Sequence, residues 1–249
     1  MVPEKVPQLN DEQEILVMNI ISPKYHIYKV ALLCLLGASS PVFASSGASD
    51  YISGSVEKKQ DDKNWRFTVY LDDQEIGYHN FSLVQKENHK EIYSNARFDV
   101  RFLFFNAYSY RHDNVEKWDG QCLKSINAVT DDNGELYNVS GKIANDAFVV
   151  NTAEKESTYL PCVQTFAYWD PDFLKETALL NSQTGEMVEV DSELIGEETL
   201  KHKGKDITAR HYRLKGDDLQ IDLWYSDDDH WLALESLTEN GSIVRYTMP

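Results

Sequence analysis

The chain is short of positive charge and of long apolar segments. It has 24 lysines and arginines against 41 aspartates and glutamates, which gives a formal net charge of -17. Such a charge repels nucleic acid and anionic membrane surfaces, so we expect neither as a partner. The apolar run VALLCLL at residues 30–36 is too short for a helix that spans a bilayer, which needs about 20 apolar residues. We therefore expect no transmembrane segment in the mature protein.

Several catalytic and cofactor motifs are missing as well. The sequence has no G-x-S-x-G turn for a nucleophilic serine, no H-E-x-x-H zinc motif and no glycine-rich phosphate loop. No CxxC motif or cysteine–histidine spacing indicates zinc or redox chemistry. We expect no metal and no cofactor, and a non-enzymatic role is favoured over an enzymatic one.

A basic region, an apolar core and small residues follow one another near the start of the chain. Lysines precede the run at 30–36, and Val42-Phe43-Ala44 follows it. This order is typical of a secretory signal peptide, so residues 1–44 are expected to be removed and the mature protein to be periplasmic. The acidic first 17 residues fit this order badly, and we expect translation to start at Met18 rather than at Met1.

The rest of the chain is predicted to form one domain. Residues 45–62 are small, polar and charged, and are expected to be a flexible lead-in. Residues 63–249 suit a single β domain, because β sandwiches and barrels of this size fold as one unit. Two cysteines survive cleavage, Cys122 and Cys162, and an even pair in an oxidising compartment is readily bridged. We predict a disulfide between them, with two buried thiols as the alternative.

Short segments in which apolar and polar residues alternate dominate the mature part. In WRFTVYL, residues 65–71, every second residue is apolar, which is typical of a half-buried strand. Such sequential strands favour roughly ten to twelve antiparallel strands in a meander curled into a cupped half-barrel or a barrel. The other segments of this kind are 76–84, 92–104, 107–118, 123–130, 136–143, 147–152, 187–190, 194–199, 207–214, 219–225, 231–238 and 243–248.

One segment departs from this pattern and predicts a helix. Asp170-Pro171 is typical of a helix start, with proline at the first helical position. Residues 172–180 have helical spacing, and Gly185 closes the segment. We therefore predict one short helix of about two or three turns.

The best polar cluster lies in YSYRHDNVEKW, residues 108–118. If this segment is one strand, alternate side chains share a face. Turned inward, that face could orient the polar end of a ligand, or supply His112 and Glu116 as an acid–base pair. Turned outward, it is an ordinary solvated face, and a hydrogen-bonded structural cluster is favoured over a catalytic one. The face consists of Tyr108, Tyr110, His112, Asn114, Glu116 and Trp118.

Aromatic residues are frequent in the predicted strands. A curved sheet with many large side chains either closes completely or leaves an apolar pocket. Phe98, Phe102 and Phe104 share a face of one predicted strand and are the candidates to line the interior. His79 and His89 have no partner in the sequence and are expected to be surface or rim residues.

Three segments carry a resemblance to a known family. They are W-x-F-x-V-x-L-D with I-G-x-H-x-F at residues 65–81, H-x-x-x-E-x-W-x-G-x-C-L at 112–123 and IDLWYS at 221–226. Together they resemble an uncharacterised family of exported proteobacterial proteins, and the likeness runs over nearly all of the mature chain. That family is similar, more distantly, to exported proteins with the cupped half-barrel of the periplasmic lipoprotein carriers and the outer-membrane lipoprotein receptor. The resemblance implies this fold and compartment, adds weight to a lipid ligand, and brings no motif for a protein partner.

These observations predict an exported, non-catalytic β protein that binds a lipid or another hydrophobic molecule in a barrel-like cavity. The face of residues 108–118 would contact the polar end of that ligand. Two alternatives stay open: an enzyme on a lipid-like substrate with His112 and Glu116 as acid and base, and a structural or assembly factor of the envelope without a small ligand.

Overall fold

The computed structural model describes residues 62–102, 105–238 and 241–248. The expected signal peptide and nearly all of the expected lead-in lie outside the described residues. Within the described part, no helix is both long enough and apolar enough to cross a membrane.

Thirteen strands of the described residues form one sheet, and two more form a small separate pair. The first group in the large sheet is β1 (Lys63–Leu71), β2 (Gln74–Gln85), β3 (Lys90–Phe102), β4 (Phe105–Asp119), β5 (Cys122–Asp132), β6 (Glu135–Ala144), β7 (Ala147–Asn151) and β8 (Glu156–Tyr159). The second group is β11 (Asp191–His202), β12 (Lys205–Gly216), β13 (Leu219–Ser226), β14 (Trp231–Leu237) and β15 (Ile243–Thr247). Between the groups lie a 3-10 helix, η1 (Pro171–Lys175), and the pair β9 (Ala178–Leu180) and β10 (Met187–Glu189).

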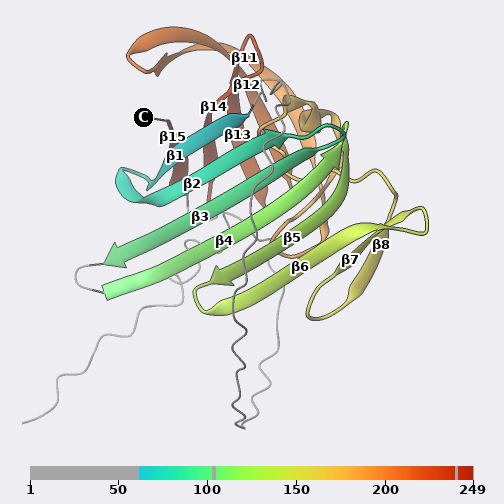
Figure 1. Ribbon diagram of the computed structural model, residues 1–249. Helices are drawn as coiled ribbons and strands as arrows, with labels where there is room; N and C mark the ends of the chain where they lie inside the picture. Colours follow the sequence, from blue (N-terminus) through green and yellow to red (C-terminus); the bar gives the residue numbers. More distant parts are fainter. Residues whose placement is uncertain (1–61, 103–104, 239–240, 249) are drawn as a thin grey trace, which may run out of the picture.

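The large sheet is an antiparallel meander whose two halves join at the chain's first and last strands. Consecutive strands pair within each half, and β15 pairs with β1, so that Val69 lies opposite Tyr246. Among the described residues, β8 pairs only with β7 and β11 only with β12, so the sheet keeps two edges. Figure 1 shows the sheet bending, with β11 to β15 standing behind β1 to β6. The predicted curled meander is confirmed, and it takes the cupped form.

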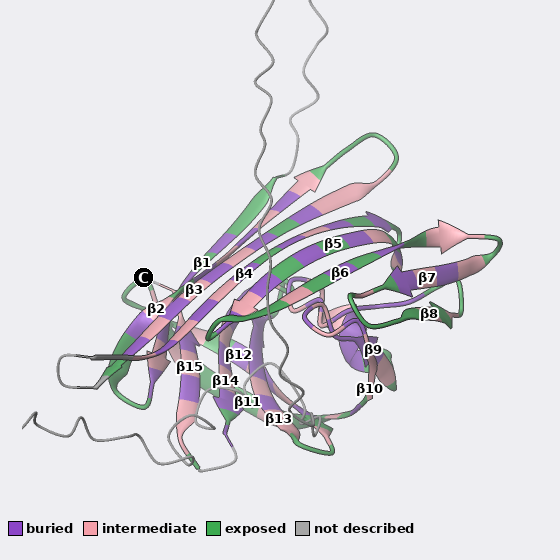
Figure 2. Cartoon of the chain, turned by 90° about the horizontal axis from the view of Figure 1, so that it is seen from below, coloured by how far each residue is buried: buried purple, intermediate pink, exposed green. Residues whose placement is uncertain are grey.

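The side chains inside the bend form the core. Along β1, Trp65, Phe67, Val69 and Leu71 are buried, as the alternation predicts, and Figure 2 shows similar bands of buried and less buried residues on the neighbouring strands. The Phe67 ring lies 4.3 Å from the ring of Trp231 on β14. Such contacts hold the two halves of the sheet against each other.

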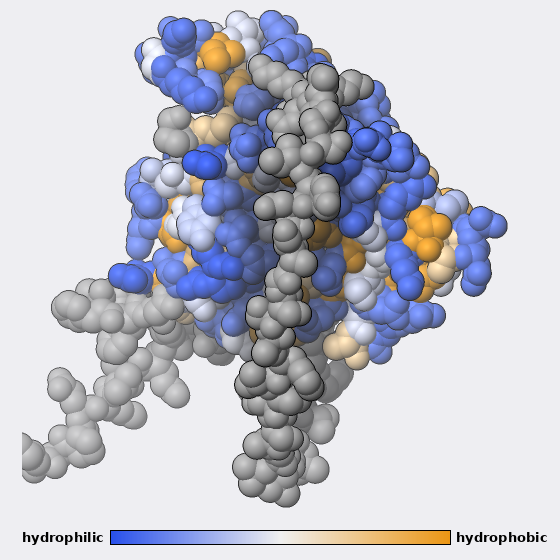
Figure 3. Space-filling view, viewed as in Figure 1, coloured by the Kyte–Doolittle hydropathy of each residue, from blue (hydrophilic) through white to orange (hydrophobic). Residues whose placement is uncertain are grey.

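The outer face of the sheet is polar. On β3 and β4, Arg97 contacts Asp113 at 2.6 Å, and Arg111 contacts Asp99 at 2.8 Å. Hydrophilic side chains cover most of the face seen in Figure 3. Long cross-strand pairs of this kind occupy the outer face and leave the opposite faces of β3 and β4 for the interior.

The predicted helix is much shorter than its sequence pattern suggests. Asp170 does cap it, because its Oδ1 accepts a hydrogen bond from the backbone N–H of Asp172 at 3.2 Å. The helix ends at Lys175 and is of the 3-10 type, and residues 178–180 form β9 instead. Leu179 and Leu180 are fully buried there, so pairing with β10 and burial in the core override the helical spacing.

The number of strands also exceeds the expected ten to twelve, since fifteen are described. The additional strands are short. β8 (ESTY) is polar and half exposed, and β9 (ALL) is three apolar residues without alternation. Neither has the period-two signal on which the prediction depended.

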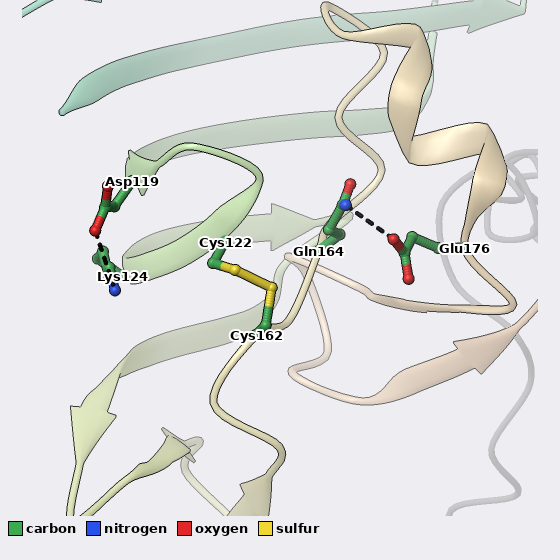
Figure 4. The surroundings of a disulfide bond; sticks show 6 residues. All are labelled: Asp119, Cys122, Lys124, Cys162, Gln164 and Glu176. Carbon is green, nitrogen blue, oxygen red and sulfur yellow. Dashed lines mark hydrogen bonds and ion pairs between the residues drawn. A yellow bond between two sulfur atoms is a disulfide. The ribbon is translucent and has the colours of Figure 1, made fainter.

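A disulfide joins Cys122 to Cys162, as predicted. Figure 4 shows that it links the start of β5 to the segment after β8, close to the contact between Gln164 and Glu176. The backbone N–H of Leu123 also donates to the carbonyl of Val163 at 3.0 Å. The disulfide and this hydrogen bond therefore attach the first residues of the segment between Cys162 and η1 to the start of β5.

Gly77 on β2 is a position where only glycine fits. Its φ is 149°, and a Cβ there would lie 1.9 Å from the carbonyl oxygen of Arg97. The close approach of β2 and β3 at this point depends on the missing side chain.

Candidate functional site

A cavity of about 320 Å³ lies inside the cupped sheet. Three parts of the chain line it. The first wall comes from β2 to β4, with His79, Phe81, Ser94, Tyr110, His112, Asn114 and Glu116. The opposite wall comes from β13 to β15, with Leu219, Ile221, Leu234, Ser236 and Tyr246, and the β12–β13 turn adds Asp217 and Asp218. The segment between β8 and β11 supplies Thr165, Phe166, Tyr168, Trp169, Asn181, Ser182 and residues 186–189.

A polar row on β4 forms the first wall. Because side chains alternate along a strand, Tyr110, His112, Asn114 and Glu116 share one face. All four are at least nine-tenths buried. The inward orientation of this face, which the sequence left open, is therefore settled by the structure.

Glu116 is the most densely hydrogen-bonded member of the row. Its Oε1 accepts from Asn114 Nδ2 at 2.9 Å, and its Oε2 accepts from Trp118 Nε1 at 2.8 Å and from Thr165 Oγ1 at 3.3 Å. Burial raises the pKa of this carboxyl above its ordinary value, while the three donors oppose that shift. The Oδ1 atom of Asn114 is buried and accepts no hydrogen bond from the described residues.

Two buried histidines lie in the same wall. His112 Nδ1 is 2.8 Å from Thr130 Oγ1, and burial lowers the pKa of His112 to about 4. His79 Nε2 is 2.7 Å from Ser94 Oγ, and burial lowers its pKa well below 6.5, with the nearby His112 adding to the effect. Both imidazoles are therefore neutral at pH 7.

His79 was expected at the surface or the rim, but the structure places it among the buried residues that line the cavity. It is two residues before Phe81 on β2 and shares its buried face, so the alternation of β2 could have placed it. Its Nδ1 lies 3.3 Å from the hydroxyl of Tyr246, which is 167 residues away in the sequence. His89 is half-buried and contacts Glu91 at 3.1 Å, in agreement with the expectation.

Three of the predicted ligand-binding residues line the cavity, namely Tyr110, His112 and Glu116. Phe98 is buried beside this wall without being part of the lining, with its ring stacked on that of its cross-strand partner Tyr110 at 5.4 Å. Phe104 lies outside the described residues, and Phe102 ends β3 without a described side chain.

Two further predicted residues support the wall from its ends. The Tyr108 hydroxyl donates to Asp132 Oδ1 at 2.5 Å, and the same carboxylate accepts from Gln183 at 3.1 Å. The Trp118 ring lies 5.5 Å from that of Trp169, edge to face. These contacts hold β4 against the segment that covers one side of the cavity.

The structure keeps His112 and Glu116 apart. They are four residues apart on an extended strand, which corresponds to about 13 Å between their Cα atoms. Among the hydrogen bonds of the described residues, none joins the two side chains, and each has partners of its own. The two side chains therefore do not pair directly with each other.

Most of the lining could not be found from sequence. Residues 165–169 and 181–186 lie outside the predicted strands, and β13 to β15 reach β4 only through the pairing of β15 with β1. In the described part of the chain, no group of three or more histidines, cysteines or acidic residues is placed to hold a metal ion.

The comparisons with known proteins concern fold and family. No curated protein matches the chain. A solved structure, described as a β-barrel-like protein of domain of unknown function DUF1849 from Brucella abortus, is similar with a TM-score of 0.56 and 10% sequence identity. The match covers 75% of this chain and 94% of that chain, and it supports the fold alone. The family model for domain of unknown function DUF6134 matches residues 67–248, and the chain belongs to that family.

Proposed function

We propose that this protein is exported and holds a lipid or another apolar molecule in its cavity without transforming it. The observation that carries the proposal is a cavity of about 320 Å³ lined by six aromatic rings and one polar row. Ligand sites in proteins have volumes of about 300–1,000 Å³ and combine apolar walls with a few polar groups. The rings are Phe81, Tyr110, Phe166, Tyr168, Trp169 and Tyr246.

The two kinds of wall suit an amphiphile. The apolar side chains of β13 and β14, such as Ile221 and Leu234, would bury a hydrocarbon chain, and burial of apolar surface is the main source of its affinity. The row of Tyr110, His112 and Glu116 would contact the polar end, as the sequence predicts.

Binding can be tested with a neutral apolar probe. N-phenyl-1-naphthylamine should bind the folded protein at one site with enhanced fluorescence. Ser182 lines the cavity on a segment outside the sheet and is half-buried, so Ser182→Trp should fill the space and weaken binding at least about tenfold. Ser140→Trp, the same change at an exposed position on β6, is the control and should bind like the wild type.

Two results would contradict binding. One is a folded wild type that does not bind the probe, and the other is equal affinity in the wild type and Ser182→Trp. If, in addition, a stable protein partner were recovered from periplasmic extract, the assembly-factor alternative would be favoured. Native mass spectrometry of the purified protein then identifies whatever co-purifies in the cavity.

Export is the second part of the proposal. It is supported by the signal-like order of residues 1–44 and by the disulfide between Cys122 and Cys162, because such bonds persist in oxidising compartments. N-terminal sequencing of protein from the periplasmic fraction should begin at Ser45. A mature chain that retains residues 30–36, or precursor peptides from before Met18, would contradict the cleavage site or the start respectively.

A further inference from the structure

The lining of the cavity is acidic. Among the residues that the structure describes, the lining contains five carboxyl groups and neither lysine nor arginine. Two lysines touch lining residues without being part of the lining. Lys155 pairs with Glu186 at 2.5 Å, and Lys90 lies 5.0 Å from the centre of the Trp169 ring. The carboxyl groups are those of Glu116, Glu186, Glu189, Asp217 and Asp218.

The two histidines do not offset this negative charge. His79 and His112 are both buried, and burial lowers the pKa of each, so they stay neutral at pH 7. A ligand carboxylate or phosphate in the cavity would therefore lose its hydration without meeting a positive side chain. That exchange is strongly unfavourable for an anion.

The polar row also has an acceptor without a donor. Asn114 donates through Nδ2 to Glu116, and its buried Oδ1 accepts no hydrogen bond from the described residues. An unpaired buried acceptor is costly, and a ligand that brings an N–H donor to this wall would satisfy it. The carboxylate of Glu116 lies on the same wall, next to the amide.

The aromatic rings favour a cation as well. Ammonium groups are attracted to the faces of phenylalanine, tyrosine and tryptophan rings, and the attraction grows when the cation loses water. Phe81, Tyr168 and Trp169 contribute such rings to the lining. The charge of the lining, its unpaired acceptor and its aromatic rings thus all favour a cationic head group with N–H donors.

We infer that the cavity selects amphiphiles with a primary ammonium head group, the long-chain alkylamine class, over fatty acids and other anionic lipids. Glu116 and Asn114 would receive the ammonium, and the carboxylates near the β12–β13 turn would attract it. This inference rests on the proposed function, because it names the class of ligand for the same cavity.

A series of ligands with the same chain tests the inference. Dodecylammonium, dodecyltrimethylammonium, dodecanol and dodecanoate are titrated below their micelle concentrations against bound N-phenyl-1-naphthylamine, at pH 7.4 and physiological salt. Dodecylammonium should displace the probe at a concentration at least about tenfold lower than dodecanoate, with dodecanol between them. Dodecyltrimethylammonium has the charge but no N–H, and should be weaker than dodecylammonium. Direct binding of dodecylammonium, measured by calorimetry, should be at least about tenfold weaker in Ser182→Trp than in the wild type, which separates the cavity from adsorption to the acidic surface.

A variant of Glu116 tests whether this residue causes the preference for the ammonium head group. Glu116→Gln keeps a side chain of the same shape that can still accept from Trp118 and Thr165, but it removes the charge. The advantage of dodecylammonium over dodecanol should fall at least about fivefold, while dodecanol itself changes by less than about threefold. Asp146→Asn, a charge removal in the exposed β6–β7 turn, is the control and should leave the ratio unchanged.

The outcomes separate the two proposals. If dodecanol and dodecanoate displace the probe as well as dodecylammonium does, the cavity binds apolar ligands but the inference on the head group is wrong. Stronger binding of dodecanoate also overturns it. If the wild type binds neither the probe nor any of the four ligands, the proposed function itself fails. The wild-type series alone is decisive if Glu116→Gln does not fold.

Discussion

Replacement of Trp231 by alanine should lower the free energy of unfolding by about 3–5 kcal/mol. Trp231 begins β14 and is fully buried. Its ring lies 4.3 Å from Phe67 on β1, 5.1 Å from Phe81 on β2 and 5.3 Å from Tyr168 in the segment before η1. One side chain thus contacts both halves of the sheet and the segment that lines the cavity, so its loss leaves a void that no single neighbour can fill.

The measurement is equilibrium unfolding in urea, followed by circular dichroism. Tyr78→Ala is the control, because it removes a large aromatic ring from the outer face of β2, where the side chain is 42% exposed. It should cost less than about 1 kcal/mol. A loss below about 1 kcal/mol in Trp231→Ala would contradict the role of this residue in joining the halves. If the alanine variant does not fold, Trp231→Phe should still fold and lose about 1–3 kcal/mol.

Acidification from pH 6.5 to pH 4 should remove about 3 kcal/mol of stability through His112 alone. The pKa of this residue is lowered from 6.5 to about 4 by burial in the folded protein. Between these two pH values the unfolded chain binds a proton at His112 and the folded chain does not. The stabilisation is therefore fully present above pH 6.5 and is lost as the pH falls through that interval.

Other buried groups near His112 also have shifted pKa values, and their contributions to the pH dependence of stability must be separated from that of His112. His79 has a lowered pKa and acts in the same direction. Burial raises the pKa values of Glu116 and Asp132, so these carboxyls act in the opposite direction as the pH falls. Asp113 on β4 and Arg97 on β3 also influence His112 through their charges.

A variant isolates the contribution of His112. His112→Gln keeps a polar partner for Thr130 and removes the titrating ring. Urea unfolding at pH 7 and pH 4 should show that the wild type loses about 3 kcal/mol more than this variant over the interval. Ser140→Gln, a change to the same residue at an exposed position on β6, should behave like the wild type. Equal losses in the wild type and His112→Gln would show that protonation of His112 is not what destabilises the fold in acid.

The strand pattern and the grouping of polar residues on one face of residues 108–118 were accessible from local sequence, whereas the inward orientation of that face was not. In residues 65–71 the alternation of apolar and polar residues assigns a buried and an exposed face without knowledge of neighbours. The same period places Tyr110, His112 and Glu116 together, and an even pair of cysteines in a chain expected to be exported predicted the bridge between Cys122 and Cys162. Residues 172–180 show the limit of such patterns, because helical spacing there is overridden by pairing of β9 with β10.

What the amino-acid sequence determined by itself was therefore the two-sided character of each strand and the order of the meander. Only the tertiary structure decided that the interior keeps a cavity and what charge surrounds it. The reason is that both depend on contacts between residues far apart in the chain, such as Thr165 with Glu116 and His79 with Tyr246. Alternation states which side chains turn inward, but the volume they leave unfilled follows from how far the sheet bends and from which loops close over it.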